Sequence, residues 1–170
     1  MFGNGTVVLP SRSSDVHHEV ELVLVIGKKA AHIQEEDSLS CVHSIAIGVD
    51  FTARDLQEKA KDKGHPWTIA KGFDTFAPLG KALPFTDSTD LQNLDLLLTI
   101  NGEVRQSGST RDMIFSCRRI ISELSSMFTL YPGDLIYTGT PEGVSAVKSG
   151  DVVEAKLIGT DSTLRLDIRG

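Results

Sequence analysis

The Asn-Gly pair at residues 101–102 is the feature that most constrains how this sequence can fold. It lies between two strand-like runs, "LDLLLTI" and "EVRQ". Asn-Gly is the favoured pair for a two-residue type I′ turn, because both central residues take positive φ and the twist of this turn matches that of the flanking strands. The pair therefore predicts two adjacent antiparallel strands and a sheet to which they belong.

Further strand signals lie on both sides of this hairpin. Apolar runs predict strands over residues 18–27 and 43–51, and "LIYTG" predicts another. The runs "VVEAKLIG" and "TLRLDIRG", joined by "GTDS", are typical of a final hairpin. Residues 1–15 are interpreted as a loose or edge-packed initial segment with Gly, Asn, Pro and Ser, and residues 16–170 as one domain.

Two main short helices are expected among these strands. "TARDLQEKAKDKG" carries a Thr-x-x-Asp capping pattern from Thr52 to Asp55 and has Gly64 at its C-terminal end. Apolar residues at helical spacing predict a second helix over about residues 115–127. Residues 68–90 have no clear period, so a loop is expected there. The prediction is an α+β fold built on a mixed, mostly antiparallel, twisted sheet.

The composition argues against nucleic acids and membranes as partners. The chain carries a formal net charge of -6 and has a pI near 5.3, whereas binding to nucleic acid phosphates needs a basic field. The longest apolar run, "LVLVIG", is too short to span a membrane, and no secretory signal is visible. These observations predict a soluble cytoplasmic protein without nucleic acid or membrane partners. A mitochondrial location is the alternative if a presequence is missing.

The two cysteines, Cys41 and Cys117, stand in no C-x-x-C or zinc-like spacing. Disulfides are rare in reducing compartments, and free cysteine is among the most buried residue types. We therefore interpret both as buried, reduced thiols.

Glu19 and Glu21 open the strand expected at 18–27. With a period of two, they point to one face with Cα atoms about 6.7 Å apart. Two ionised carboxylates in a partly buried site repel and lose hydration, so either one stays protonated or a cation joins them. Asp50 ends the next strand and adds a third acid. Oxygen donors from two neighbouring strands suit a hard cation, Mg²⁺ first, then Mn²⁺ or Ca²⁺.

This spacing alone leaves other interpretations open. Acids at strand ends are often solvated or paired with Lys or Arg, and E-x-E recurs in sequences that bind no metal. His17, beside the pair, is interpreted as a hydrogen-bonded structural histidine rather than a ligand. The sequence contains no G-x-S-x-G, G-x-x-x-x-G-K or G-x-G-x-x-G, so it does not support a serine-hydrolase elbow, a P-loop or a dinucleotide fingerprint.

Five ordered blocks extend this interpretation: "HHEVEL", "GVDFTARDLQ", "PWTIAKGFDTFAPLG", "INGEVRQSGSTRDMIF" and "PGDLIYTGTPEGV". From His17 to the last strand they resemble the fumarylacetoacetate hydrolase family, and are most similar to its single-domain acylpyruvase and carboxymethyl-hydroxymuconate isomerase-like members. The resemblance implies a mixed β-sheet roll, a homodimer, and a divalent metal held by Glu19, Glu21 and Asp50.

The same resemblance implies roles for four further residues. Lys71, in "AKGFD", would be catalytic and face the developing oxyanion of the substrate. Thr140, in "TGTP", would hydrogen-bond the substrate carboxylate. Arg54 and Gln57 match positions of polar groups near the pocket and would also bind substrate. For Arg54 the alternative is an ion pair on its own helix, and for Thr140 a role in a turn only.

The activity implied is a metal-dependent hydrolase that cleaves a C–C bond of acylpyruvate-type 2-oxo acids through a metal-stabilised enolate. The alternatives are an isomerase, tautomerase or decarboxylase acting on hydroxymuconate-type acids or oxaloacetate.

One departure from the family pattern adds a third expectation. Family members usually begin with a G-x-N-Y-x-x-H-like segment and, in hydrolases, carry a lid His and Glu that activate water. This sequence begins just before the Glu19–Glu21 strand. A catalytically impaired metal-binding homologue is therefore also expected, with His32, His43 and His65 as substitute bases to test if hydrolysis is fast.

Overall fold

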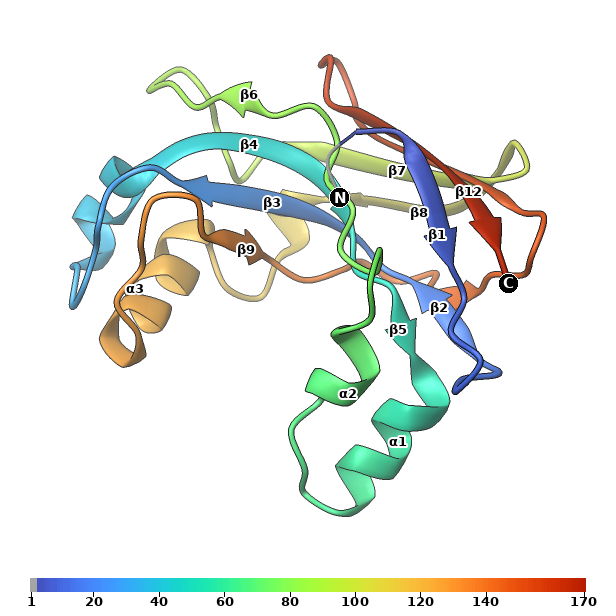
Figure 1. The fold of residues 1–170 in the computed structure, drawn as a ribbon. Helices are drawn as coiled ribbons and strands as arrows, with labels where there is room; N and C mark the ends of the chain where they lie inside the picture. The colour runs from blue at the N-terminus through green and yellow to red at the C-terminus, as the bar shows by residue number, and fades with distance from the viewer. Residues whose placement is uncertain (1–2) are drawn as a thin grey trace.

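The computed structural model describes residues 3–170, which form strands and short helices around a curved central strand pair (Figure 1). The strands are β1 Gly5–Val8, β2 Val16–His18, β3 Val20–Ile26, β4 Val42–Val49, β5 Thr52–Ala53, β6 Leu83–Pro84, β7 Asp95–Ile100, β8 Glu103–Ser109, β9 Leu135–Tyr137, β10 Ser145–Ala146, β11 Val152–Leu157 and β12 Thr163–Arg169. The α-helices are α1 Arg54–Asp62, α2 Thr68–Lys71 and α3 Cys117–Met127, and the 3₁₀ helices are η1 Glu35–Cys41 and η2 Thr110–Asp112.

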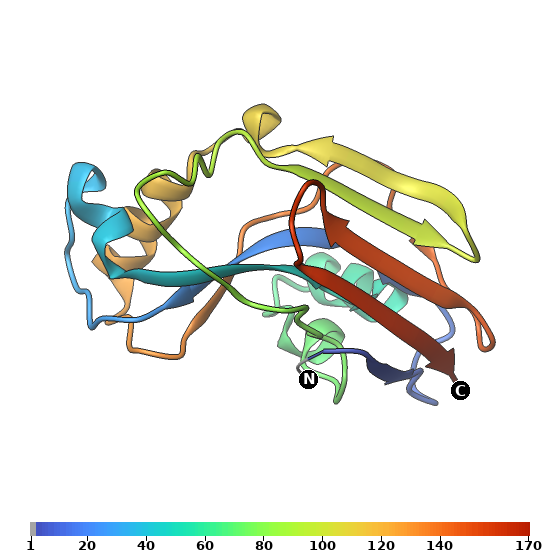
Figure 2. The same cartoon turned by 90° about the horizontal axis from the view of Figure 1, so that it is seen from above.

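The strands form three sheets in the part of the chain that the structure describes. Their orders are β1-β12-β11-β7-β8, β10-β2-β5 and β6-β4-β3-β9. The β1–β12 pair is parallel, and the other named pairs are antiparallel. Seen from above, α3 and η1 lie at one end of the molecule and β11 with β12 at the other (Figure 2). The predicted α+β fold with a mixed, mostly antiparallel sheet is confirmed.

Both predicted hairpins are present. Asn101 and Gly102 take φ values of 52° and 83° and join β7 to β8, as a type I′ turn requires. Strands β11 and β12 form the final hairpin. Strand β1, in the initial segment, pairs with the edge of the same sheet, which agrees with the edge-packed alternative. The division into residues 1–15 and one domain over 16–170 stays a prediction.

Strand β3 is buried on both faces, and this determines where its acids point. Leu22 and Leu24 belong to the main hydrophobic cluster, which also contains residues from both ends of the chain. Val23, on the opposite face, packs in a smaller cluster with Ala46 and Leu79. Because side chains alternate along a strand, Glu21 shares the face of Val23. It therefore lies on the side away from the main core.

Helix α1 begins one residue later than its capping pattern predicts. Thr52 lies in β5, and the N-cap position is Ala53, whose side chain makes no cap hydrogen bond. Asp55 instead accepts a hydrogen bond from the Ser13 hydroxyl at 2.6 Å. The predicted Thr52 cap was wrong because strand pairing places this residue in a sheet and its hydroxyl accepts from Lys71.

The end of α1 agrees with the prediction. Gly64 has φ +62°, in the left-handed region that favours glycine. Its N–H donates to the Lys61 carbonyl at 3.0 Å, and the His65 N–H donates to the Ala60 carbonyl at 2.8 Å. These two bonds form a Schellman motif, which satisfies carbonyls that the last helical turn leaves free.

The remaining helices match the sequence unevenly. Helix α3 lies within the predicted range 115–127, and its N-cap Ser116 accepts from the Arg119 N–H at 3.1 Å. Helix α2 was missed, because Thr68–Lys71 is a single turn, too short to show a 3.6-residue period. No helix within residues 3–170 is long and apolar enough to cross a membrane.

The prediction that both cysteines are buried thiols is confirmed. Cys41 and Cys117 are both free and buried. Burial raises the pKa of the Cys117 thiol to about 11, so this thiol stays protonated at neutral pH.

Candidate metal centre

Glu19 and Asp50 lie at two strand junctions that run side by side. Glu19 separates β2 from β3, which belong to different sheets, and Asp50 separates β4 from β5 in the same way. The Asp50 N–H donates to the Glu19 carbonyl at 2.8 Å. The single strand predicted over 18–27 is therefore two strands. Glu19 lies at the break between these strands, and Glu21 is the second residue of β3.

The junctions bring the three predicted ligands together. One oxygen from each of Glu19, Glu21 and Asp50 lies within 4.8 Å of the other two. Glu21 is 4% exposed and Glu19 is 8% exposed, while Asp50 is half-buried. Buried carboxylates at this spacing need compensating positive charge, since each has lost most of its hydration.

The pKa values of the three acids differ with their neighbours. Burial raises the pKa of Glu21 to about 7, with the charges of Asp50 and Glu19 adding to the effect against a hydrogen bond from Gly139. Burial also raises the pKa of Asp50. Burial acts on Glu19 in the same direction, but the hydrogen bond from Arg54 and the charge of Lys71 outweigh it and lower its pKa.

Lys71 places an ammonium group among these acids. Its Nζ donates to Glu19 Oε2 at 3.1 Å, to the Asp50 carboxylate, and to Thr52 Oγ1 at 3.0 Å. Helix α2 positions it, because Lys71 is the last residue of that turn. The ammonium lies between two predicted metal ligands, so these two acids are paired with a lysine, the arrangement that the sequence leaves open beside a metal.

Arg54 and Gln57 lie on the other side of Glu19. The Arg54 guanidinium donates to Glu19 Oε1 at 2.5 Å and to Gln57 Oε1 at 2.6 Å. Both residues are in the first turn of α1, and Gln57 is buried. The alternative for Arg54, an ion pair with an acid of its own helix, is not formed in the described structure. The resemblance placed both residues near the pocket, and they lie beside the acid cluster.

The residues fit a divalent cation. Three carboxylates supply the hard oxygen donors that Mg²⁺, Mn²⁺ and Ca²⁺ prefer, and two cationic side chains are present for three acids. Burial, together with the negative charges of Asp50 and Glu21, raises the pKa of the nearby Tyr137 phenol. Three protein ligands leave about three positions of an octahedral ion for water or substrate.

Thr140 lies at the edge of this cluster, but protein groups engage its hydroxyl. The hydroxyl donates to the Val20 carbonyl at 2.9 Å and accepts from Gln106 Nε2 at 2.8 Å. The neighbouring Gly139, with φ +104°, donates its N–H to Glu21 Oε2 at 2.7 Å. Sequence reasoning missed this contact with Glu21. Its one sequence signal is the glycine of "TGTP", which allows the positive φ.

His18 and Gln106 were also missed. His18 is fully buried, with Nδ1 at 2.8 Å from Gln106 Oε1 and Nε2 at 2.9 Å from the Ser145 hydroxyl. Because Gln106 Oε1 can only accept, Nδ1 carries the proton. Burial lowers the pKa of His18 and favours the neutral ring. Their only sequence signal is a polar residue on the buried face of a strand.

The other histidines lie outside this centre. His17 bonds Asp15 through Nε2 at 2.9 Å, which confirms its interpretation as a hydrogen-bonded histidine. Within residues 3–170, no hydrogen bond or ion pair joins His32, His43 or His65 to any of the three acids. They therefore remain untested as bases.

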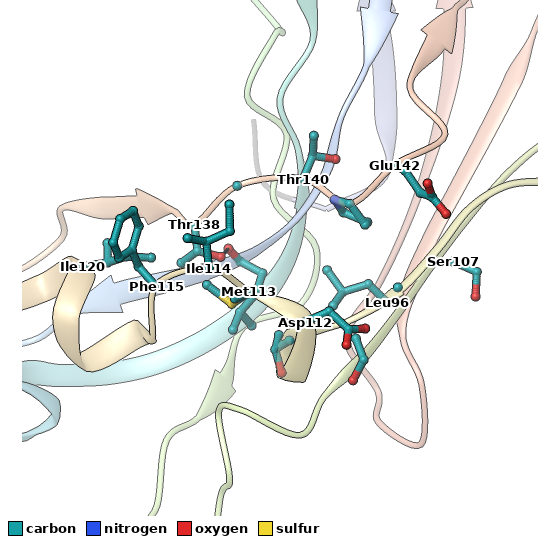
Figure 3. Close-up of a pocket in the computed structure, with 16 residues that line it drawn as sticks. Leu96, Ser107, Asp112, Met113, Ile114, Phe115, Ile120, Thr138, Thr140 and Glu142 are labelled. Carbon is teal, nitrogen blue, oxygen red and sulfur yellow. Dashed lines mark hydrogen bonds between the residues drawn. The ribbon is translucent and has the colours of Figure 1, made fainter.

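A cavity of about 600 Å³ lies next to the Thr138–Glu142 segment (Figure 3). Met113, Ile114 and Phe115 gather at one end and Glu142 lies at the other. Leu22, which points to the opposite face of β3 from Glu21, also lines it, whereas the three acids do not. The cavity therefore adjoins the acid cluster through Gly139, whose N–H binds Glu21, and through Thr140.

Comparison with known proteins places this chain in a family. The family model for the C-terminal part of fumarylacetoacetate (FAA) hydrolase matches residues 1–166. A mitochondrial oxaloacetate decarboxylase of Dictyostelium discoideum is 43% identical over 98% of this chain and 76% of its own length. A mitochondrial oxaloacetate tautomerase of Arabidopsis thaliana is 47% identical over 96% of this chain and 73% of its own length.

Solved structures agree with this assignment. The crystal structure of a fumarylpyruvate hydrolase from Pseudomonas aeruginosa, in complex with Mn²⁺ and pyruvate, superposes with a TM-score of 0.94 at 35% identity. The match covers 99% of this chain and 74% of the other. The fold, the acid cluster and the match along nearly the whole sequence lead to one conclusion. This chain belongs to the fumarylacetoacetate hydrolase family and is an enzyme of that family.

Proposed function

We propose that this chain is a divalent-metal-dependent enzyme that interconverts the keto and enol forms of oxaloacetate-type 2-oxo dicarboxylates. The observation that carries the proposal is the placement of the Lys71 ammonium among the three acids. Lys71 and a metal ion held by the acids would then both stabilise negative charge on the same substrate oxygen. The names of the relatives from Dictyostelium and Arabidopsis support the substrate class.

Glu19, Glu21 and Asp50 would hold the metal ion, with Mg²⁺ as the first choice and Mn²⁺ or Ca²⁺ as alternatives. The bound ion would supply Lewis-acid stabilisation of negative charge on the 2-oxo oxygen of the substrate. The Mn²⁺ in the Pseudomonas structure supports a divalent ion of this group.

The side chains around the acids have distinct tasks in this proposal. Lys71 Nζ would donate a hydrogen bond to the 2-oxo oxygen, which is negative in the enolate that links the keto and enol forms, with solvent water exchanging the proton at C3. Arg54, held by Glu19 and Gln57, presents its remaining N–H groups to a substrate carboxylate, for which a planar guanidinium is suited. Thr140 is proposed to bind the second carboxylate by turning its hydroxyl proton away from the Val20 carbonyl, to which it donates at 2.9 Å. Tautomerisation needs only proton transfer, so it makes no demand for an activated water.

A second candidate is hydrolysis of the C–C bond in an acylpyruvate. The fumarylpyruvate hydrolase at TM-score 0.94, with pyruvate bound, favours it specifically. Tautomerisation and C–C hydrolysis both form an enolate with a negative 2-oxo oxygen. They differ because only hydrolysis requires water to attack the substrate. The third candidate is a metal-binding homologue without turnover. In it the acids would bind the metal ion in the same way, and Lys71 would have no catalytic role.

One assay panel separates these candidates. Enol-to-keto conversion of oxaloacetate, its decarboxylation, and cleavage of an acylpyruvate are measured with Mg²⁺ or Mn²⁺ and again with excess EDTA. The proposal expects enol–keto conversion to be the fastest activity and to disappear with EDTA. Faster acylpyruvate cleavage would instead establish the hydrolase. Mn²⁺ binding without turnover of any substrate would establish the metal-binding homologue.

We also propose that the chain forms a homodimer. Large apolar side chains lie exposed on one stretch of sequence, with Ile114 92% and Phe115 62% exposed. Exposed apolar residues of this size favour association with a second copy. Light scattering at micromolar concentration should give twice the chain mass of 18.4 kDa. A single species at the chain mass would contradict the proposal.

The predicted cytoplasmic location stays a prediction. The word mitochondrial in the names of the Dictyostelium and Arabidopsis relatives supports the alternative.

A further inference from the structure

Gln106 is a fully buried amide whose four hydrogen-bonding positions are all used. Its Oε1 accepts from His18 Nδ1 at 2.8 Å and from the Val20 N–H at 3.0 Å. Its Nε2 donates to Thr140 Oγ1 at 2.8 Å and to the Pro141 carbonyl at 2.9 Å. A carboxamide offers two donors and two acceptor positions, so this one has no capacity left for any other group.

These partners belong to the two segments that hold Glu21. Val20 lies between Glu19 and Glu21, at the point where the chain changes sheets. Thr140 follows Gly139, whose N–H binds Glu21 Oε2 at 2.7 Å. The Thr140 hydroxyl also donates to the Val20 carbonyl, so the segments are joined directly as well as through Gln106. Gln106 therefore connects the backbone of the acid pair to the donor that orients one of its carboxylates.

The packing around Gln106 admits little movement. A Cβ on Gly108, in the same strand, would lie 2.6 Å from Pro141 Cβ. A Cβ on Gly143, where φ is +97°, would overlap the carbonyl oxygen of Arg105. Two glycines thus allow β8 and the 139–143 segment to approach so closely that the Gln106 amide reaches both Thr140 and Pro141. A shorter or apolar side chain could not replace these contacts.

We infer that Gln106 is a positioning residue of the metal centre. It fixes the spacing between the start of β3 and the 139–141 segment, and so fixes where the Glu21 carboxylate points. The inference rests on the proposed function, because it assumes that the acids bind a divalent cation. Gln106 touches none of the three carboxylates, so it acts through Val20, Thr140 and Gly139.

The test compares Gln106→Met with a matched control, Gln92→Met. Gln92 also joins two segments, donating to the Thr110 carbonyl at 3.1 Å and accepting from the Cys117 N–H at 2.8 Å, but it does not contact the metal centre. Free Mn²⁺ is measured by electron paramagnetic resonance, and thermal melting is recorded for both variants. Loss of an outer residue that orients a ligand typically costs about 10–100-fold in metal affinity. Gln106→Met should show this loss, and Gln92→Met should bind Mn²⁺ as the unmodified chain does.

A second variant keeps the inference testable if Gln106→Met does not fold. Thr140→Val removes the hydroxyl partner from a less buried position, and it too should weaken Mn²⁺ binding. If the folded variants at 106 and 140 bind Mn²⁺ with unchanged affinity, Gln106 does not position the centre, although the proposed function stands. If the unmodified chain binds no Mn²⁺, the proposed function itself fails.

Discussion

Replacing Glu21 by glutamine is expected to weaken Mn²⁺ binding more than 100-fold. Glu21 is the most buried of the three acids, and Gly139 fixes its carboxylate through a hydrogen bond of 2.7 Å. Glutamine keeps the shape and can still accept from Gly139, but it carries no negative charge for a cation. The loss should exceed the roughly 10–100-fold effect typical of a residue outside the ligand set. Titration calorimetry with Mn²⁺ measures it.

The control for this variant is Glu154→Gln, which changes an exposed strand glutamate paired with Arg165. Its Mn²⁺ affinity should not change. In the absence of metal, Glu21→Gln should melt at the same temperature as the unmodified chain or higher, since it removes one of three like charges whose oxygens lie within 4.8 Å. Equal Mn²⁺ affinity for Glu21→Gln and the unmodified chain would remove this acid from the metal centre.

Replacing Lys71 by methionine should separate metal binding from catalysis. Methionine retains an unbranched side chain without the ammonium that bonds Glu19 and Asp50. Loss of a group that donates a hydrogen bond to the negative oxygen should slow enol–keto conversion by about 10²–10³-fold. Mn²⁺ affinity should stay equal or increase, because the ammonium no longer competes with the ion for these two acids. Steady-state rates and Mn²⁺ titration on the same preparation give both results.

Lys148→Met serves as the matched control, since Lys148 is an exposed lysine outside the metal centre. It should leave both the rate and the Mn²⁺ affinity unchanged. A Lys71→Met protein that is folded, binds Mn²⁺ and retains the full rate would show that another group stabilises the negative oxygen.

The parts of the fold that local rules govern could be predicted from the sequence. Asn101-Gly102 specified a hairpin because the turn needs two residues with positive φ. Gly64 marked the end of α1 for a similar reason. The break at Glu19 could not be predicted, because a single residue lies between β2 and β3 and their separation depends on which strands each one pairs with. Thr52 was misassigned because pairing with β2 outweighed its preference for a helix cap.

The candidate site divides in the same way. The sequence indicated a site at Glu19 and Glu21, because these two acids lie at the start of an apolar strand and burying like charges is costly without a cation. Gln106 and Gly139 gave no comparable signal. Their importance comes from contacts distant in sequence: 86 residues separate Gln106 from Val20, and 118 separate Gly139 from Glu21. Only the folded chain brings these residues to the acids.

Exchange of the C3 protons of a 2-oxo acid for deuterium, followed by NMR, tests the central claim most directly. Oxaloacetate in D₂O with Mg²⁺ is compared with and without the protein, then with excess EDTA and with Glu21→Gln. The account predicts that the protein accelerates loss of the C3 proton signal over the Mg²⁺ control, and that EDTA or the Glu21 variant abolishes the acceleration. An exchange rate equal to that of the protein-free Mg²⁺ solution would contradict it.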